Sequence, residues 1–144
     1  MHTKTVDRIM PDKTRLTFDA SNGSLLSAQR KQNINHLAIF QPNCVMDVRL
    51  SVNMEHKIPI ESIKDEVLMA SENAVKRKKD RVSYEVARGL LSVDLTQVAQ
   101  NDGSGNKIKH ELELEVKNPE LLFKSPEALK DFVDSIREMC QLIK

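Results

Sequence analysis

The sequence contains few aromatic side chains: among 144 residues there are no tryptophans, one tyrosine and four phenylalanines. Surfaces that stack the bases of single-stranded nucleic acid need aromatic rings, so this composition argues against such a surface. The two cysteines, Cys44 and Cys140, lie far apart and lack the paired spacing of a metal site, and we expect both to be reduced thiols. Neither a signal peptide nor an apolar run long enough to cross a bilayer is visible in these 144 residues, so we expect no membrane partner.

The chain also lacks an excess of charge of either sign. It carries 22 basic and 21 acidic residues, for a formal net charge of +1. Total charge therefore identifies no partner, and the distribution of charge along the chain becomes the informative quantity. The length suits one domain with a core of its own, and we expect a single domain over residues 1–144.

The clearest pattern is the strict alternation of polar and apolar residues at positions 109–117, which predicts a strand with one polar face. Glu111, Glu113 and Glu115 share that face, roughly 7 Å apart. Three like charges in a row repel one another, and a hard divalent cation such as Mg²⁺ or Mn²⁺ would offset the repulsion. The alternative interpretation is the solvated face of an ordinary amphipathic sheet.

Further alternating stretches predict strands at residues 14–20, 45–57, 76–86 and 90–99. Ser21-Asn22-Gly23 and Arg88-Gly89 supply turns. In the less regular stretch 25–40, polar residues occupy odd positions up to Asn35, which places Lys31, rather than Arg30, on the polar face. The polar faces then carry Arg15, Thr17, Asp19, Lys31, Asp47, Arg49, Ser51, Asn53, Glu55, Arg77, Lys79, Arg81, Ser92, Asp94 and Thr96.

Two segments have helical rather than alternating periodicity. Residues 60–75 predict a short helix or an ordered connection. The chain after Pro126 predicts an amphipathic helix that packs on the sheet, with Ser125 as its N-cap. Residues 101–107, which contain Asp102-Gly103-Ser104-Gly105, predict a flexible hairpin connection.

Charges of opposite sign are segregated onto different strands. Glutamates line residues 111–115, and the basic side chains of Arg77, Lys79 and Arg81 line another strand. A soluble surface more often mixes its signs. A barrel with the polar faces inside would bring the two rows opposite each other, so that acids could hold a divalent cation and bases could hold phosphate oxygens.

These residues resemble the metal-dependent RNA 5′-triphosphatases of fungi, which are the β subunits of mRNA-capping enzymes and belong to the triphosphate tunnel metalloenzymes. The resemblance runs from about Arg8 to the C-terminus. It implies a mainly β (α+β) fold: an eight-stranded antiparallel β-barrel, or triphosphate tunnel, with a polar interior, plus a C-terminal helix. The resembling motifs are Arg15-Leu16-Thr17-x-Asp19, Asp47-x-Arg49-x-Ser51-x-Asn53-x-Glu55, Arg77-x-Lys79-Asp80-Arg81-x-Ser83-Tyr84, Asp94-Leu95-Thr96 and His110-Glu111-x-Glu113-x-Glu115.

The resemblance implies hydrolysis of the γ-phosphate of triphosphate-ended nascent RNA, the first step of mRNA capping, with Mg²⁺ or Mn²⁺. It also implies a guanylyltransferase partner (the capping enzyme α subunit), a homodimer and a nuclear location. Glu55 would orient the attacking water, while Asp94 and Thr96 would support the metal or the basic row. The metal would be served by Glu111, Glu113 and Glu115, and the phosphate oxygens by Arg15, Lys31, Arg77, Lys79 and Arg81.

One feature of the family has no counterpart in this sequence. The family's first strand carries a Glu-x-Glu pair that completes the metal site, whereas residues 2–11 contain only Asp7 as a carboxylate. We therefore expect either that the chain is the C-terminal part of a longer protein or that it has lost metal binding. Two other functions stay open: a nucleoside triphosphate or polyphosphate hydrolase of the same fold, and a non-catalytic module that binds triphosphate or RNA ends.

Overall fold

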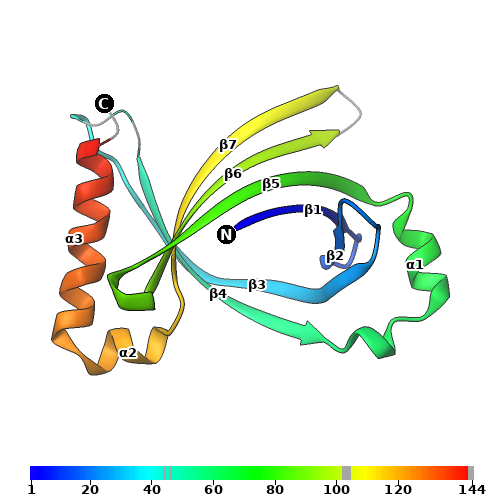
Figure 1. The fold of residues 1–144 in the computed structure, drawn as a ribbon, viewed down its shortest axis with the longest axis horizontal. Coiled ribbons are helices and arrows are strands. Elements are labelled where there is room, and N and C mark those ends of the chain that lie inside the picture. The colour runs from blue at the N-terminus through cyan, green and yellow to red at the C-terminus, as the bar shows by residue number, and fades with distance from the viewer. Residues whose placement is uncertain (44, 46, 102–104, 143–144) are drawn as a thin grey trace.

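The structure, a computed structural model, describes residues 1–43, 45, 47–101 and 105–142. Its seven strands form one antiparallel sheet in the order β4-β3-β2-β1-β5-β6-β7 (Figure 1). The fold class expected from the sequence is therefore confirmed. The strands are β1 (His2–Ile9), β2 (Thr14–Asp19), β3 (Leu25–Ile39), β4 (Val48–Ile58), β5 (Val75–Val86), β6 (Leu91–Asn101) and β7 (Asn106–Val116).

The sheet is strongly curved. In Figure 1, β5, β6 and β7 arch over one side of the molecule and β3 and β4 run along the other, with β1 and β2 between them. Within the described residues β4 and β7 are the two outer strands, so the seven strands form a half-barrel rather than a closed one. The hairpin connection expected at residues 101–107 lies partly outside the described residues, because positions 102–104 are not among them.

Strand pairing places the predicted polar residues on a common face, because residues opposite each other in a sheet point to the same side. Arg81 pairs with Thr96, and Thr96 pairs with Glu111. On the other arm, Lys31 pairs with Glu55, which confirms the parity predicted for Lys31.

The parity predicted for Asn35 is wrong. The β3–β4 register shifts between Asn33 and Asn35, so Asn35 lies opposite Val52 and His36 lies opposite Ser51. A bulge of this kind adds one residue to one strand and turns the following side chains to the other face. Alternation alone does not reveal it.

The main apolar core lies on the outer side of β2 and β3. Leu16, Phe18 and Ala28 are buried there, and Val67 and Leu68 of the helix α1 (Asp65–Ser71) pack against them. This helix and the 3₁₀ turn η1 (Ile60–Ser62) fall within the segment for which a helix was predicted. The apolar faces of β2 and β3 thus pack in this core, which leaves their polar faces for the inner side of the sheet.

Two helices follow β7: α2 (Pro119–Lys124), which the sequence pattern did not predict, and α3 (Pro126–Leu142). A second 3₁₀ turn, η2 (Ala87–Gly89), connects β5 to β6. The Ser125 hydroxyl accepts a hydrogen bond from the backbone N–H of Ala128 at 3.2 Å, which confirms the predicted N-cap. No residue of α3 is fully buried, but Phe132, Ile136, Met139 and Cys140 of its apolar face are partly buried, and α2 lies beside it (Figure 1). The packing of this face on the sheet stays a prediction. None of the helices in the described ranges has the length and apolar character needed to cross a membrane.

Candidate functional site

A buried carboxylate, Asp7 of β1, lies at the centre of the polar face. It is 2% exposed. Lys79 Nζ of β5 lies 2.6 Å from Asp7 Oδ2, Arg15 Nε of β2 lies 3.7 Å from the same oxygen, and the hydroxyl of Thr17 donates to Asp7 Oδ1 at 2.9 Å. Because β1 sits between β2 and β5, one carboxylate positions cations from both neighbouring strands.

Lys79 is the most deeply placed cation of this group, with 12% of its side chain exposed. Burial lowers the pKa of Lys79, the hydrogen bond and charge of Asp7 act against that effect, and the charges of Arg15 and Arg77 lower the pKa further. The net direction is downward from the ordinary value of 10.5. Several positive charges are therefore held close together, an arrangement that an anionic ligand would stabilise.

Arg81 connects three strands through its guanidinium group. Its Nη1 lies 2.8 Å from Asp94 Oδ2, its Nη2 lies 3.0 Å from Glu113 Oε2, and its Nε donates to Thr96 Oγ1 at 2.9 Å. The rigid fork of arginine suits several simultaneous contacts of this kind. Asp94 and Thr96, predicted to support the metal or the basic row, therefore lie beside the basic row.

Asp94 is 2% exposed and accepts a hydrogen bond from the hydroxyl of Ser92 at 2.6 Å. Burial acts to raise the pKa of Asp94, but hydrogen bonds from Ser92 and Ser83, together with the charges of Arg81 and Lys117, lower it overall. The carboxylate is therefore ionised at neutral pH and provides a fixed negative charge that orients Arg81.

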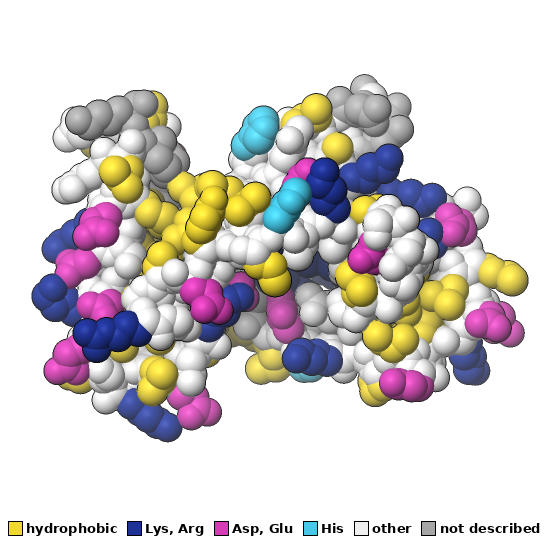
Figure 2. Space-filling view, viewed as in Figure 1, with side chains coloured by type: hydrophobic (Ala, Val, Ile, Leu, Met, Phe, Trp, Pro, Cys, Tyr) yellow, Lys and Arg dark blue, Asp and Glu magenta, His cyan; other side chains and the backbone are white. Residues whose placement is uncertain are grey.

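The predicted glutamate row lies along β7, and a basic side chain contacts each member. Arg77 Nη2 lies 3.1 Å from Glu111, Arg81 contacts Glu113, and Lys117 Nζ lies 2.9 Å from Glu115. The acidic and basic rows thus share one face, as predicted. Figure 2 shows acidic and basic side chains inside the hollow near the centre of the view.

Carboxylate oxygens are the donors that Mg²⁺ and Mn²⁺ prefer, so the chemistry of the row suits such an ion. The glutamate row alone does not have the geometry of a metal site, however. Across the described parts of the chain, no three acidic, histidine or cysteine side chains lie close enough together to hold a metal ion. The described residues therefore provide carboxylates for a metal site without forming a closed one.

Lys31 and Glu55 lie on the other arm of the half-barrel. Lys31 Nζ is 4.0 Å from Glu55 Oε1, and both side chains are partly exposed. Strands β2 and β1 separate this pair from the basic row of β5. The pair points to the same face as that row, but no contact joins the two groups in the described residues.

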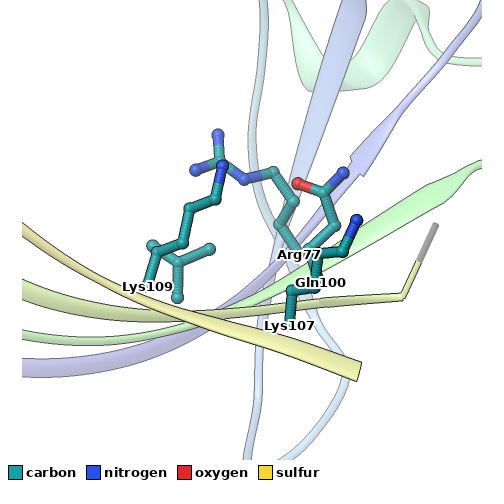
Figure 3. A pocket seen from close by; sticks show the side chains of 5 residues that line it. Arg77, Gln100, Lys107 and Lys109 are labelled. Carbon is teal, nitrogen blue, oxygen red and sulfur yellow. The ribbon is translucent and has the colours of Figure 1, made fainter. Parts of the chain in front are cut away.

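Sequence reasoning missed two features of this face. In the sequence Asp7 is a lone carboxylate, although Thr3, Thr5 and Asp7 alternate in the pattern of the other strands. Lys109 shares the parity of Glu111, and it lines a pocket of about 100 Å³ together with Arg77, Val98, Gln100 and Lys107 (Figure 3). Extending the glutamate register two residues towards the start of β7 would have placed Lys109 on this face.

Comparisons with known proteins agree with this geometry. A family described as mRNA capping enzyme, beta chain, matches residues 2–142. The mRNA-capping enzyme subunit beta of Candida glabrata is 31% identical over 139 residues, which cover 93% of this chain and 22% of the relative. The subunit of the same name from Schizosaccharomyces pombe is 30% identical over 124 residues, covering 81% of this chain and 38% of the relative.

Solved structures of the S. pombe Pct1 RNA triphosphatase resemble this fold. One superimposes with a TM-score of 0.75 at 27% identity, over 97% of this chain and 57% of that chain. A second, in complex with the Spt5 CTD, gives a TM-score of 0.77. The chain thus spans less than two thirds of the length of each of these relatives.

Proposed function

Because the chain belongs to the family of the mRNA capping enzyme beta chain, we propose that it binds the triphosphate end of nascent RNA and releases the γ-phosphate, the first step of mRNA capping. The observation that carries the proposal is the position of Arg81 between Asp94 and Glu113. That contact joins the basic row of β5 to the acidic row of β7 on one face.

The basic row would bind the phosphate oxygens. Arg77, Lys79 and Arg81 recur at every second position of β5, and their present partners are the carboxylates of Glu111, Asp7, Asp94 and Glu113. A triphosphate would offer these cations oxygens of higher charge density. Phosphoryl transfer to water depends mostly on positioning and charge neutralisation, which these residues supply.

The remaining predicted residues take supporting roles in this proposal. Arg15 and Lys31 would bind further phosphate oxygens, Asp94 and Thr96 would hold Arg81 in place, and Glu55 would orient the attacking water. Glu111, Glu113 and Glu115 would give carboxylate oxygens to Mg²⁺ or Mn²⁺. When bound, such an ion neutralises charge on the phosphoryl group. Because the described residues form no closed metal site, further ligands would have to complete it.

The proposal extends to the setting of the reaction. The relatives from C. glabrata and S. pombe are named subunit beta of an mRNA-capping enzyme. We accordingly propose that this protein works in the nucleus with the guanylyltransferase that acts next on the same RNA end. We also propose that it forms a homodimer.

A second function is favoured by one observation, the absence of three clustered metal ligands in the described residues. A protein of this kind would bind RNA ends through the basic row and release no phosphate. The two functions differ in their response to a chelator. Hydrolysis requires the divalent ion, whereas binding by arginine and lysine persists in its absence.

The test is release of phosphate from γ-labelled triphosphate-ended RNA in the presence of Mn²⁺ or Mg²⁺. Glu113→Gln retains the shape of the side chain but removes its charge, and we expect it to slow release by about a hundredfold to a thousandfold. A chelator should abolish release from the unaltered protein. RNA binding that survives the chelator without any release would favour the second function, and release that is indifferent to Glu113→Gln would contradict the first.

A further inference from the structure

We propose that Lys109 and Gln100, in the pocket beside Arg77, bind a backbone phosphate of the RNA strand, downstream of the 5′ triphosphate that Arg77 helps to hold. This inference rests on the proposed function and adds a subsite to it. The subsite would distinguish an RNA end from a free nucleotide, which has no phosphodiester to place there.

Lys109 is the first observation. It lies on β7 opposite Val98 of β6, on the face that carries Glu111 two residues further along. Its side chain is exposed, and it makes no ion pair within the part of the chain that the structure describes. In Figure 3 the Lys109 side chain extends towards the guanidinium group of Arg77, so two cations face the same small space.

Arg77 provides the second observation. Its Nη2 contacts Glu111 at 3.1 Å, but its Nε is buried and has no hydrogen-bond acceptor among the described residues. A buried donor without an acceptor is costly, so the present partners of Arg77 leave part of its hydrogen-bonding capacity unused. None of the five residues that line the pocket is acidic, and the Gln100 carboxamide adds a polar group to the cations.

The position of the pocket identifies which phosphate it suits. Lys109 precedes Glu111 by two residues and Glu113 by four, which corresponds to roughly 7 Å and 14 Å along the strand. A triphosphate held by Arg81 near Glu113 would end before it reached Lys109. A nucleotide chain continuing along the same face would bring a phosphodiester to the pocket.

The residues that line the pocket also indicate a contact with RNA that does not depend on base sequence. The five lining residues include no aromatic ring on which a base could stack. Contacts to phosphate position a strand without reading its bases. An enzyme that acts on the ends of many different transcripts needs a contact of this kind.

The experiment measures equilibrium binding of a short triphosphate-ended RNA and of ATP to this protein, over a series of salt concentrations. We expect Lys109→Ala to weaken RNA binding about threefold to tenfold at low salt and to reduce the salt slope by about 0.7, with ATP affinity unchanged. Lys109→Glu should weaken RNA binding further, again without affecting ATP. The matched control is Lys78→Ala, on the same sheet but opposite Ala99 on the other face.

Each other outcome overturns the inference in a distinct way. Equal losses for RNA and ATP in Lys109→Ala would mean that the pocket holds the triphosphate itself. No loss for RNA would mean that the strand takes another path, and the proposed function would stand if Arg81→Ala still abolished ATP binding. If the unaltered protein bound neither ligand, the proposed function would fail, and this inference with it.

Discussion

Lys79 of β5 and Asp7 of β1 form an ion pair of 2.6 Å in which the carboxylate is 2% exposed and the lysine 12%. The two residues are far apart in sequence and meet only because β1 pairs with β5. Asp7 also lies 3.7 Å from Arg15. It is therefore the carboxylate that holds cations of two strands towards the polar face.

The first prediction concerns this pair. Asp7→Asn should lower the free energy of unfolding by about 3 kcal/mol, because it leaves the Lys79 ammonium buried without its counter-charge. Asp80→Asn provides the control, since Asp80 lies on the same strand as Lys79 but its ion pairs are exposed. That variant should lose much less stability, because exposed ion pairs contribute little. Urea denaturation would measure both, and equal losses would show that burial of the pair has no energetic consequence.

The second prediction concerns the pH dependence of stability. The pKa of Asp94 is lowered in the folded protein from its ordinary value of 3.8. The folded state therefore binds fewer protons than the unfolded state at acid pH, so Asp94 contributes stability that is present above pH 3.8 and is lost as the pH falls below it. Asp94→Asn should show a smaller decline over that range in urea midpoints measured at several pH values. Parallel declines in the two proteins would contradict the assignment.

The third prediction concerns the geometry around Arg81. Arg81→Lys keeps the charge but cannot contact Asp94, Thr96 and Glu113 together, as the guanidinium does. We expect a loss of about 1–3 kcal/mol in unfolding free energy, measured by urea denaturation. Arg137→Lys, at an exposed position of α3, should leave stability unchanged. An unchanged unfolding free energy in Arg81→Lys would mean that charge alone matters at this position.

Alternation along single strands predicted much of this site. Because side chains of a strand point alternately to its two faces, the sequence was sufficient to place Arg77, Lys79 and Arg81 together and to exclude Lys78. The resemblance to capping-enzyme β subunits then supplied the barrel in which acids face bases. The roles of the individual site residues stay predictions.

The alternation of polar and apolar residues does not predict strand order or local irregularities. Nothing within residues 2–9 indicates that Asp7 would lie opposite Arg77, because that contact depends on which strands pair. The bulge at Asn33–Asn35 changes the parity of β3, and the two asparagines alone do not show where the extra residue falls. The apolar face of α3 predicted a packed helix, but an amphipathic face alone does not specify which surface covers it.

The most direct test of the central claim compares Arg77 with its neighbour Lys78. Arg77 points to the face that carries Glu111, whereas Lys78 lies on the other side of β5, opposite Val6 and Ala99. We predict that Arg77→Ala weakens binding of triphosphate-ended RNA by about tenfold to a hundredfold, since a charge-assisted contact is lost. Lys78→Ala should leave the dissociation constant within about threefold of its original value. Equal losses for the two variants would contradict the assignment of the basic row, and with it the triphosphate site.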